Sequence, residues 1–116
     1  MSSNSGTTND HIIDLTKLEY FQPFEGLKAK LFHSETQTIS FWGIDKDAVL
    51  PEHKHINEQV SFVTKGVLAL TIDGVTTEMK PGMVAHIPPN VLHSAVAITD
   101  VEVTDVFYPI RDDFPK

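Results

Sequence analysis

Three histidines and a glutamine have the residue types and the spacing of a metal-binding site. His53 and His55 are one residue apart, Gln59 follows them, and His93 comes from a separate part of the chain. Side chains two residues apart in an extended segment project from the same face, and Gln59 keeps that parity if the segment stays extended. Imidazole nitrogens and an amide oxygen suit a borderline divalent ion. Such a shell is uncharged, so an ion held in it would act as a strong Lewis acid.

Neighbouring residues allow alternative assignments. The chain has no cysteine, so a thiolate site and a disulfide framework are both excluded. Glu58 stands beside Gln59, but an extended strand would turn it to the opposite face, and we rank it second as a ligand. His86 shares the parity of Val84. It either lines the pocket or, as we prefer, has a hydrogen-bonded structural role.

A carboxylate interrupts an apolar row near the C-terminus. Alternate positions of segment 101–108 carry Val101, Val103, Asp105 and Phe107. This row is the more apolar one and is expected to face the interior. A buried, unpaired carboxylate is costly, so Asp105 needs a metal, a cation or hydrogen-bond donors nearby. Arg111 is a candidate partner, and an Asp–Arg pair that only pins the C-terminal segment is the structural alternative.

The elements that must position these residues are predicted to be strands. Apolar and polar residues alternate in several short segments, and turn residues separate them. The predicted strands are residues 27–31, 38–42, 60–72 with a bend at Gly66, 75–79, 83–87, 94–98 and 101–108. Asp73-Gly74 is a two-residue hairpin signal of the kind that requires positive φ. A helical period is confined to residues 12–20, so the pattern indicates an all-β sandwich or barrel.

Composition limits the classes of function. With 116 residues the chain is long enough for one domain, which we place at residues 12–116 after a disordered tail of residues 1–11. The net charge of −7 and the absence of a basic run argue against nucleic acid and anionic membrane partners. No apolar stretch is long enough to span a bilayer. The N-terminal segment lacks the features of a secretory signal, so the cytoplasm is the expected compartment.

The spacing of these residues resembles the two signature motifs of the cupin superfamily, G-x5-H-x-H-x3-4-E-x6-G and G-x5-P-x-G-x2-H-x3-N. The positions in register are His53, His55, Gly66, Gly82, Pro88 and His93. The chain departs from the motifs at Asp47, Gln59, Asn90 and Ala97, where the family has glycine, glutamate, glycine and asparagine. The resemblance implies a double-stranded β-helix of the jelly-roll type, usually dimeric. The glutamine at position 59 bears on metal identity more than on metal binding.

The C-terminal segment, Asp105 to Phe114, is similar to that of the pectin-degradation cupins, which act on unsaturated uronates released by polysaccharide lyases. This resemblance implies that Asp105, Phe107 and Arg111 lie in the active pocket. The implied reaction converts a 4,5-unsaturated monouronate from pectin or alginate to the linear 4-deoxy-5-keto acid. In that reaction Asp105 would be the general base and acid, Arg111 would bind the substrate carboxylate and Phe107 would shape the sugar pocket.

Two other functions also fit these residues. Three histidines and a weak amide ligand also suit an Fe(II)-dependent dioxygenase, and cupin barrels also serve as non-catalytic sugar or metabolite sensors. The expected cofactor is a divalent transition metal, namely Zn, Ni, Fe, Mn or Co. The expected partners are a small anionic sugar and a second copy of the chain, with the aromatic N-terminal segment exchanged between subunits.

Overall fold

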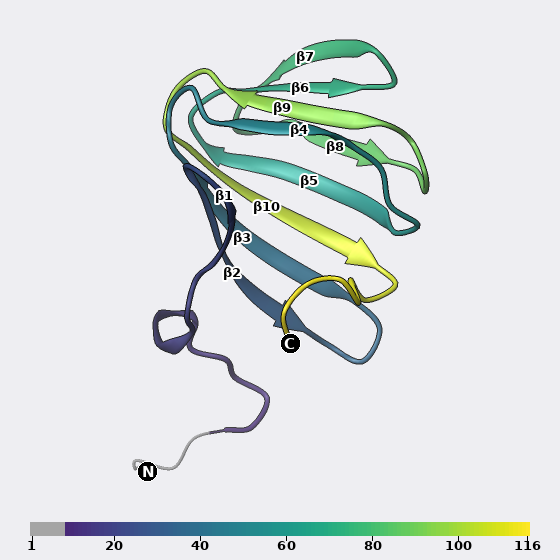
Figure 1. Cartoon of the computed structure of the whole chain (residues 1–116). Coiled ribbons are helices and arrows are strands. Elements are labelled where there is room, and N and C mark those ends of the chain that lie inside the picture. The colour runs from purple at the N-terminus through teal and green to yellow at the C-terminus, as the bar shows by residue number, and fades with distance from the viewer. Residues whose placement is uncertain (1–8) are drawn as a thin grey trace.

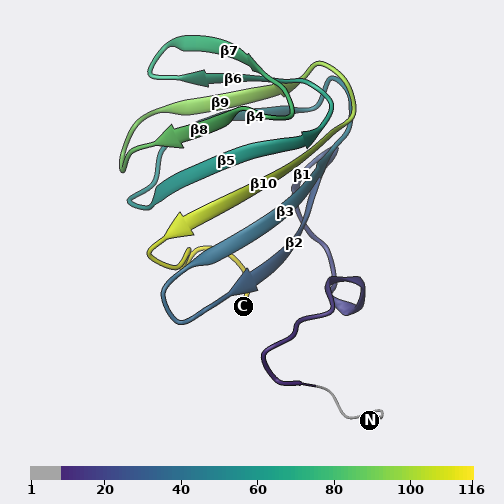
Figure 2. The same ribbon diagram turned by 180° about the vertical axis from the view of Figure 1, so that it is seen from behind.

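The computed structural model describes residues 9–116, and these fold into two facing antiparallel β-sheets (Figures 1 and 2). The first sheet has the strand order β1-β2-β3-β10-β5-β8 and the second β4-β9-β6-β7. The strands are β1 Phe21–Phe24, β2 Leu27–His33, β3 Thr38–Ile44, β4 Val49–His53, β5 Glu58–Lys65, β6 Leu68–Ile72, β7 Val75–Met79, β8 Val84–Ile87, β9 His93–Ala97 and β10 Val101–Tyr108. This is the predicted all-β jelly roll, a double-stranded β-helix.

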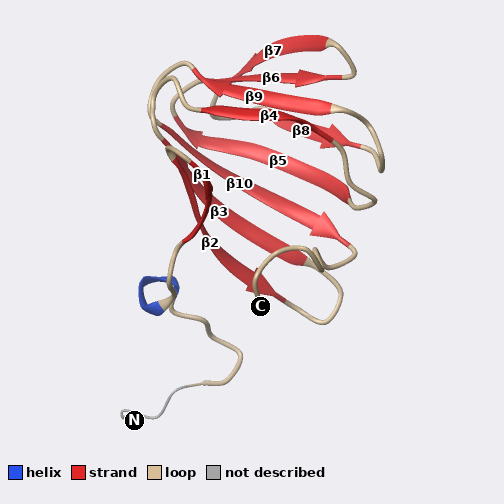
Figure 3. Ribbon diagram, viewed as in Figure 1, coloured by secondary structure: helices blue, strands red, loops and turns tan. Residues whose placement is uncertain are grey.

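Helix is confined, within the described residues, to a 3₁₀ turn at Leu15–Lys17, shown in blue in Figure 3. Asp14 caps this turn by accepting a hydrogen bond from the Thr16 amide. No helix in the described part of the chain is long and apolar enough to cross a membrane. The predicted tail of residues 1–11 falls mostly on residues 1–8, which lie outside the described residues.

The strand predictions are confirmed wherever apolar residues alternate, and two strands were missed. β7 and β10 match their predicted bounds, and 60–72 divides at Gly66 into β5 and β6. Asp73 and Gly74 both have positive φ, as the hairpin signal requires. The missed strands, β1 and β4, each contain a proline and lie at a sheet edge. Proline cannot donate to a ladder hydrogen bond, so an edge is where a strand tolerates it.

The space between the sheets is divided into an apolar end and a polar end. Val101 and Val103, at the start of β10, pair with Ile44 and Trp42 of β3 and belong to the apolar cluster. Further along β10 the inward positions are Asp105 and Phe107. The other members of the apolar cluster are Leu27, Ile44, Val63, Leu68, Leu70, Met79, Ala85, Ala95 and Ala97. Along β10 the apolar cluster thus comes first, and the candidate site follows it.

Candidate metal centre

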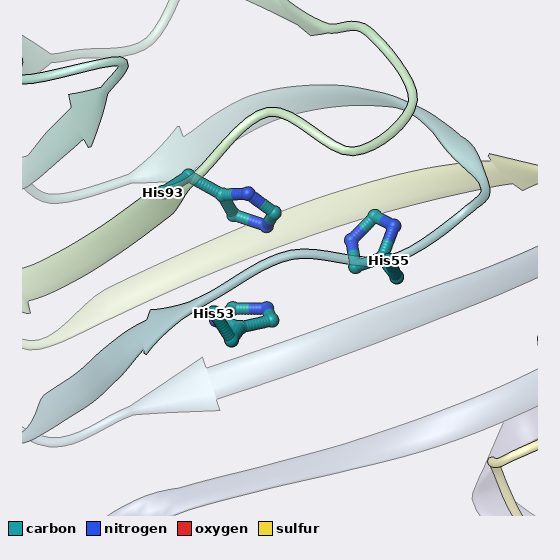
Figure 4. A group of neighbouring side chains, drawn as sticks. All are labelled: His53, His55 and His93. Atoms are coloured by element: carbon teal, nitrogen blue, oxygen red, sulfur yellow. The ribbon is translucent and has the colours of Figure 1, made fainter.

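Two strand ends and one loop bring His53, His55 and His93 together. His53 is the last residue of β4 and His93 the first of β9, and the two face each other across this strand pair. His55 lies in the β4–β5 loop, so the segment is not extended throughout as the parity argument assumed. One ring nitrogen from each histidine lies within 4.8 Å of the others. Figure 4 shows the three rings turned toward a common point.

Backbone carbonyls determine which ring nitrogen of each histidine is free. The Nδ1 atoms of His53, His55 and His93 lie 2.9, 3.0 and 2.9 Å from the carbonyl oxygens of Pro51, Asn57 and Val91. A carbonyl only accepts, so each Nδ1 carries the proton and each Nε2 keeps a free lone pair. Fixing the tautomer of a ligating histidine in this way is typical of metal sites.

Two further properties of these histidines suit a cation ligand. His93 Nε2 is buried and has no hydrogen-bond partner, which is costly for a polar atom unless something binds there. Burial lowers the pKa of His93 to about 4. Burial, together with the positive charge of Arg111, also lowers the pKa of His55. Both rings are therefore neutral at physiological pH, which is the form that binds a metal.

Gln59 completes the predicted ligand set. It is buried on β5, and its Oε1 lies 2.9 Å from His55 Nε2. Both atoms are acceptors when the His55 proton is on Nδ1, so neither donates to the other. Two ligands at right angles, each about 2.1 Å from one ion, lie about 3.0 Å apart. The three histidines could therefore hold a metal ion, and the pair His55–Gln59 has the separation of adjacent ligands.

The alternative ligand Glu58 faces outward, as strand parity predicted. Its Oε2 lies 2.6 Å from His86 Nε2, and both side chains are about half exposed. His86 therefore does not line the pocket, and that alternative is wrong. The reason is the register of β8, which turns Ala85 and Ile87 inward and leaves Val84 and His86 outside. The preferred interpretation of His86 as a hydrogen-bonded histidine agrees with its bond to Glu58.

Asp105 occupies the polar end of the interior, where its side chain lines the cavity. Its neighbours across the ladder are Ser40 of β3 and Ser61 of β5, and Ser61 Oγ donates to Asp105 Oδ1 at 2.6 Å. Burial raises the pKa of the Asp105 carboxyl to about 6, against the opposing effects of hydrogen bonds and of the Arg111 charge. A carboxyl poised in this range can take up and release a proton near neutral pH.

Arg111 is paired with Asp113, which corrects the suggested Asp105–Arg111 pair. Its Nε and Nη2 donate to the two Asp113 carboxylate oxygens at 2.9 and 2.8 Å. Its guanidinium carbon lies 4.7 Å from the Phe107 ring centre and 4.0 Å from that of Phe114. The planar guanidinium is thus held by a bidentate pair with Asp113 and by two aromatic rings. Asp105 instead accepts a hydrogen bond from Ser61.

Most of the candidate site residues border one cavity of about 460 Å³. Its lining includes His53, Gln59, His93, Asp105, Phe107 and Arg111, together with apolar residues such as Leu27 and Leu70. This volume falls in the range of small-molecule sites. Sequence reasoning missed Ser61, Trp42 and Asp113 as members of the site. Ser61 shares the strand parity of Gln59, which is the signal that would have found it.

Residues 40–107 match the Cupin domain family. The chain therefore belongs to the cupin family, and the three-histidine cluster is its candidate metal site.

Known relatives agree with this assignment. An RmlC-like cupin from Shewanella frigidimarina is 29% identical, with a TM-score of 0.84 over 90% of this chain and 96% of that one. KdgF from Halomonas sp. is 27% identical, with a TM-score of 0.79 over 84% of this chain and 92% of that one. An uncharacterized protein of Streptomyces coelicolor is 26% identical over 73% of this chain and 82% of its own length. Salicylate 1,2-dioxygenase from Pseudoaminobacter salicylatoxidans shares the fold alone, at 18% identity and a TM-score of 0.72 over 75% of this chain and 26% of that one.

Proposed function

We propose that this cupin is a metal-dependent enzyme that opens the ring of 4,5-unsaturated uronate monosaccharides. The product is the linear 4-deoxy-5-keto uronate. The observation that carries the proposal is that a carboxyl group, Asp105, and a buried cation, Arg111, line the same cavity as His53 and His93. The resemblance of the C-terminal segment to uronate ring-opening cupins and the likeness to KdgF support it.

A positive site inside a negative protein is what an anionic sugar requires. The net charge of −7 repels uronates at long range, so attraction must be local. His53, His55, Gln59 and His93 would hold a divalent ion, which when bound supplies a Lewis acid for a substrate oxygen. Arg111 binds the substrate carboxylate through the Nη1 donors that Asp113 does not occupy. Phe107 packs beside Arg111 and keeps water from the sugar.

Asp105 moves the proton that the reaction must transfer. Its carboxylate accepts the proton of the anomeric hydroxyl, so C1 becomes an aldehyde as the bond from C1 to the ring oxygen breaks. The electron pair stays on the ring oxygen and leaves an enolate over C4, C5 and that oxygen. Asp105 returns the proton to C4, which gives the 5-keto group. Substrate and product are isomers, so no other reactant is needed.

The test is Asp105→Ala. We expect the variant to lose formation of the linear product from an unsaturated galacturonate or mannuronate-derived monosaccharide, because it lacks the proton acceptor. Its metal content, measured by elemental analysis, should equal that of the wild type. Turnover at the wild-type rate by Asp105→Ala would show that the mechanism is wrong.

The same neutral ligand set also favours a second candidate, an Fe(II)-dependent dioxygenase, because three imidazoles and an amide leave iron with open positions. Oxygen uptake by the iron-loaded protein, and none with zinc or nickel, would select it. Tight uronate binding without turnover would instead indicate a sensor. Assays with each of Zn, Ni, Fe, Mn and Co also identify the working metal.

A further inference from the structure

Ser61 joins the proposed metal centre to Asp105. It is buried on β5, two residues after Gln59 on the same face, and lies opposite Asp105 in the ladder with β10. Its Oγ donates to Asp105 Oδ1 at 2.6 Å and accepts from Gln59 Nε2 at 2.9 Å. Gln59 Oε1 in turn lies 2.9 Å from His55 Nε2. One hydroxyl therefore lies between the proton-transfer group and an expected ligand.

The chemistry of a hydroxyl gives this chain of contacts a direction. Serine has one proton to donate, and the Asp105 carboxylate has none, so the serine proton lies toward Asp105. Ser61 Oγ can then only accept from Gln59, which requires the amide NH₂ to face Ser61. The amide oxygen is left facing the histidines. If the Gln59 amide were flipped, its oxygen would face Ser61 Oγ, whose proton is already donated to Asp105. The amide N–H groups would then face the cation.

We propose that Ser61 is a positioning residue that fixes the amide oxygen of Gln59 toward the metal ion and makes this orientation depend on the Asp105 carboxylate. The inference rests on the metal centre of the proposed function but not on the identity of its substrate.

This role also accounts for the glutamine at a position where the cupin motif has glutamate. A carboxylate at position 59 would offer Ser61 no proton, so two anions would compete for the single serine hydroxyl. The amide supplies the missing donor and adds no negative charge near Asp105. The donors and acceptors of Gln59, Ser61 and Asp105 are therefore complementary.

The experiment compares Co²⁺ affinity, by competition titration against a chelator, in Ser61→Ala and Ser40→Ala. We expect Ser61→Ala to bind Co²⁺ about tenfold more weakly, since loss of a group that orients a ligand costs roughly 10–100-fold in affinity. Ser40 is the matched control, because it is also buried and also pairs with Asp105 in the ladder, but its Oγ accepts a hydrogen bond from Trp42 Nε1 at 2.8 Å. Ser40→Ala should stay within about twofold of the wild type.

Testing Ser61→Ala in a Gln59→Glu background separates an effect on the orientation of residue 59 from general damage to the barrel. Both oxygens of a carboxylate are potential ligands, so in Gln59→Glu the orientation of the group no longer matters. Adding Ser61→Ala to Gln59→Glu should therefore weaken Co²⁺ binding by about twofold or less. General damage to the barrel would instead weaken binding equally in both backgrounds. Ser61→Thr keeps the hydroxyl and should keep the affinity, which covers the case in which Ser61→Ala folds poorly.

Equal Co²⁺ affinity of Ser61→Ala and wild type, or an equal loss in both backgrounds, would overturn the inference. A wild type that binds no Co²⁺ would overturn it too. Because this readout needs no sugar, the inference survives if uronates prove not to be substrates. Conversely, if Ser61→Ala binds Co²⁺ as tightly as the wild type but the wild type turns over uronates, the proposed function stands and the inference about Ser61 fails.

Discussion

Each histidine of the cluster is held by a carbonyl two residues away in the sequence, and this local bond does more than orient a ring. It assigns the proton to Nδ1 and thereby makes Nε2 a ligand before any ion arrives. The three carbonyls belong to the same short chain segments that carry the histidines. The metal-free protein is therefore expected to keep the geometry of the site.

Replacing His93 should empty the centre. His93→Ala removes the most buried of the three imidazoles and is expected to lower the bound metal, per protein, by at least about tenfold. The measurement is elemental analysis of untagged protein after loading with each candidate ion. His86→Ala removes an outward-facing histidine and is the matched control, with unchanged metal content. Equal loading of the two variants would contradict the assignment.

The buried carboxyl of Asp105 should make stability depend on pH. Burial raises its pKa from 3.8 to about 6, so the folded state binds the proton more tightly than the unfolded chain. Its contribution to stability is full below pH 4 and is lost as the pH rises through 6. Asp105→Asn stays neutral, so its stability relative to wild type should be about 1–3 kcal/mol more favourable at pH 8 than at pH 4.

Urea unfolding of the metal-free proteins at the two pH values measures this difference. The amide introduced by Asp105→Asn keeps an oxygen that can accept from Ser61, so the comparison isolates the charge. The same difference between variant and wild type at both pH values would contradict the assigned pKa.

For single residues, the sequence predicted the inward direction of those side chains whose orientation follows from strand parity. His53, Gln59, Asp105 and Phe107 all alternate with outward neighbours, so their inward direction could be inferred without coordinates. The bond between Arg111 and Asp113 could not, because it depends on how the segment after β10 turns back over the cavity. The contact of Ser61 with Asp105 depends on cross-strand register, which a single sequence does not specify.

Some strands can be predicted from the sequence pattern alone and others cannot. β7 and β10 were predicted at their observed bounds because alternation and a hairpin signal mark them. β1 and β4 were missed because their prolines, Pro23 and Pro51, are read as strand breakers. Sheet order resolves the conflict, since both strands occupy edges. The jelly-roll topology itself came from the motif resemblance, because periodicity alone cannot choose between sandwich and barrel.

Gly66, between β5 and β6, should tolerate no side chain. Its φ is +84°, and an added Cβ would lie 2.1 Å from the Asp100 carbonyl oxygen and 2.6 Å from Thr99 Oγ1. Gly66→Ala is therefore expected to cost more than about 3 kcal/mol, because a backbone clash adds to the left-handed strain. Gly74→Ala is the control, since its φ is +81° with open space around it, and it should cost only about 1–2 kcal/mol.

Denaturant unfolding of both glycine variants gives the comparison. Similar losses of stability in the two would mean that strain, rather than the close approach of the Asp100 carbonyl, explains the glycine at position 66.

Part of the described N-terminal segment lies outside the barrel. The segment of residues 9–17 extends away from the two sheets (Figure 1), and the described chain measures 50 × 28 × 26 Å. Ile12 and Ile13 in this segment are 70% and 45% exposed. Apolar side chains presented on an extended segment are suited to a partner surface.

We expect this segment to pack on a second copy of the chain. Light scattering on the eluting protein should then give twice the chain mass of 12.9 kDa. Ile12→Asp combined with Ile13→Asp should shift the mass to that of one chain, because charged residues cannot be buried there unpaired. Val75→Asp is the control, since Val75 is equally exposed but lies on β7. A monomeric wild type would contradict the expectation.

Trp42 is the single tryptophan of the chain and borders the cavity. Its intrinsic fluorescence therefore reports on this one place in the protein. A paramagnetic ion seated among the histidines would quench the emission, and a sugar displacing cavity water would shift its wavelength. The molecule thus carries its own optical probe, and candidate ligands can be screened in solution without any label.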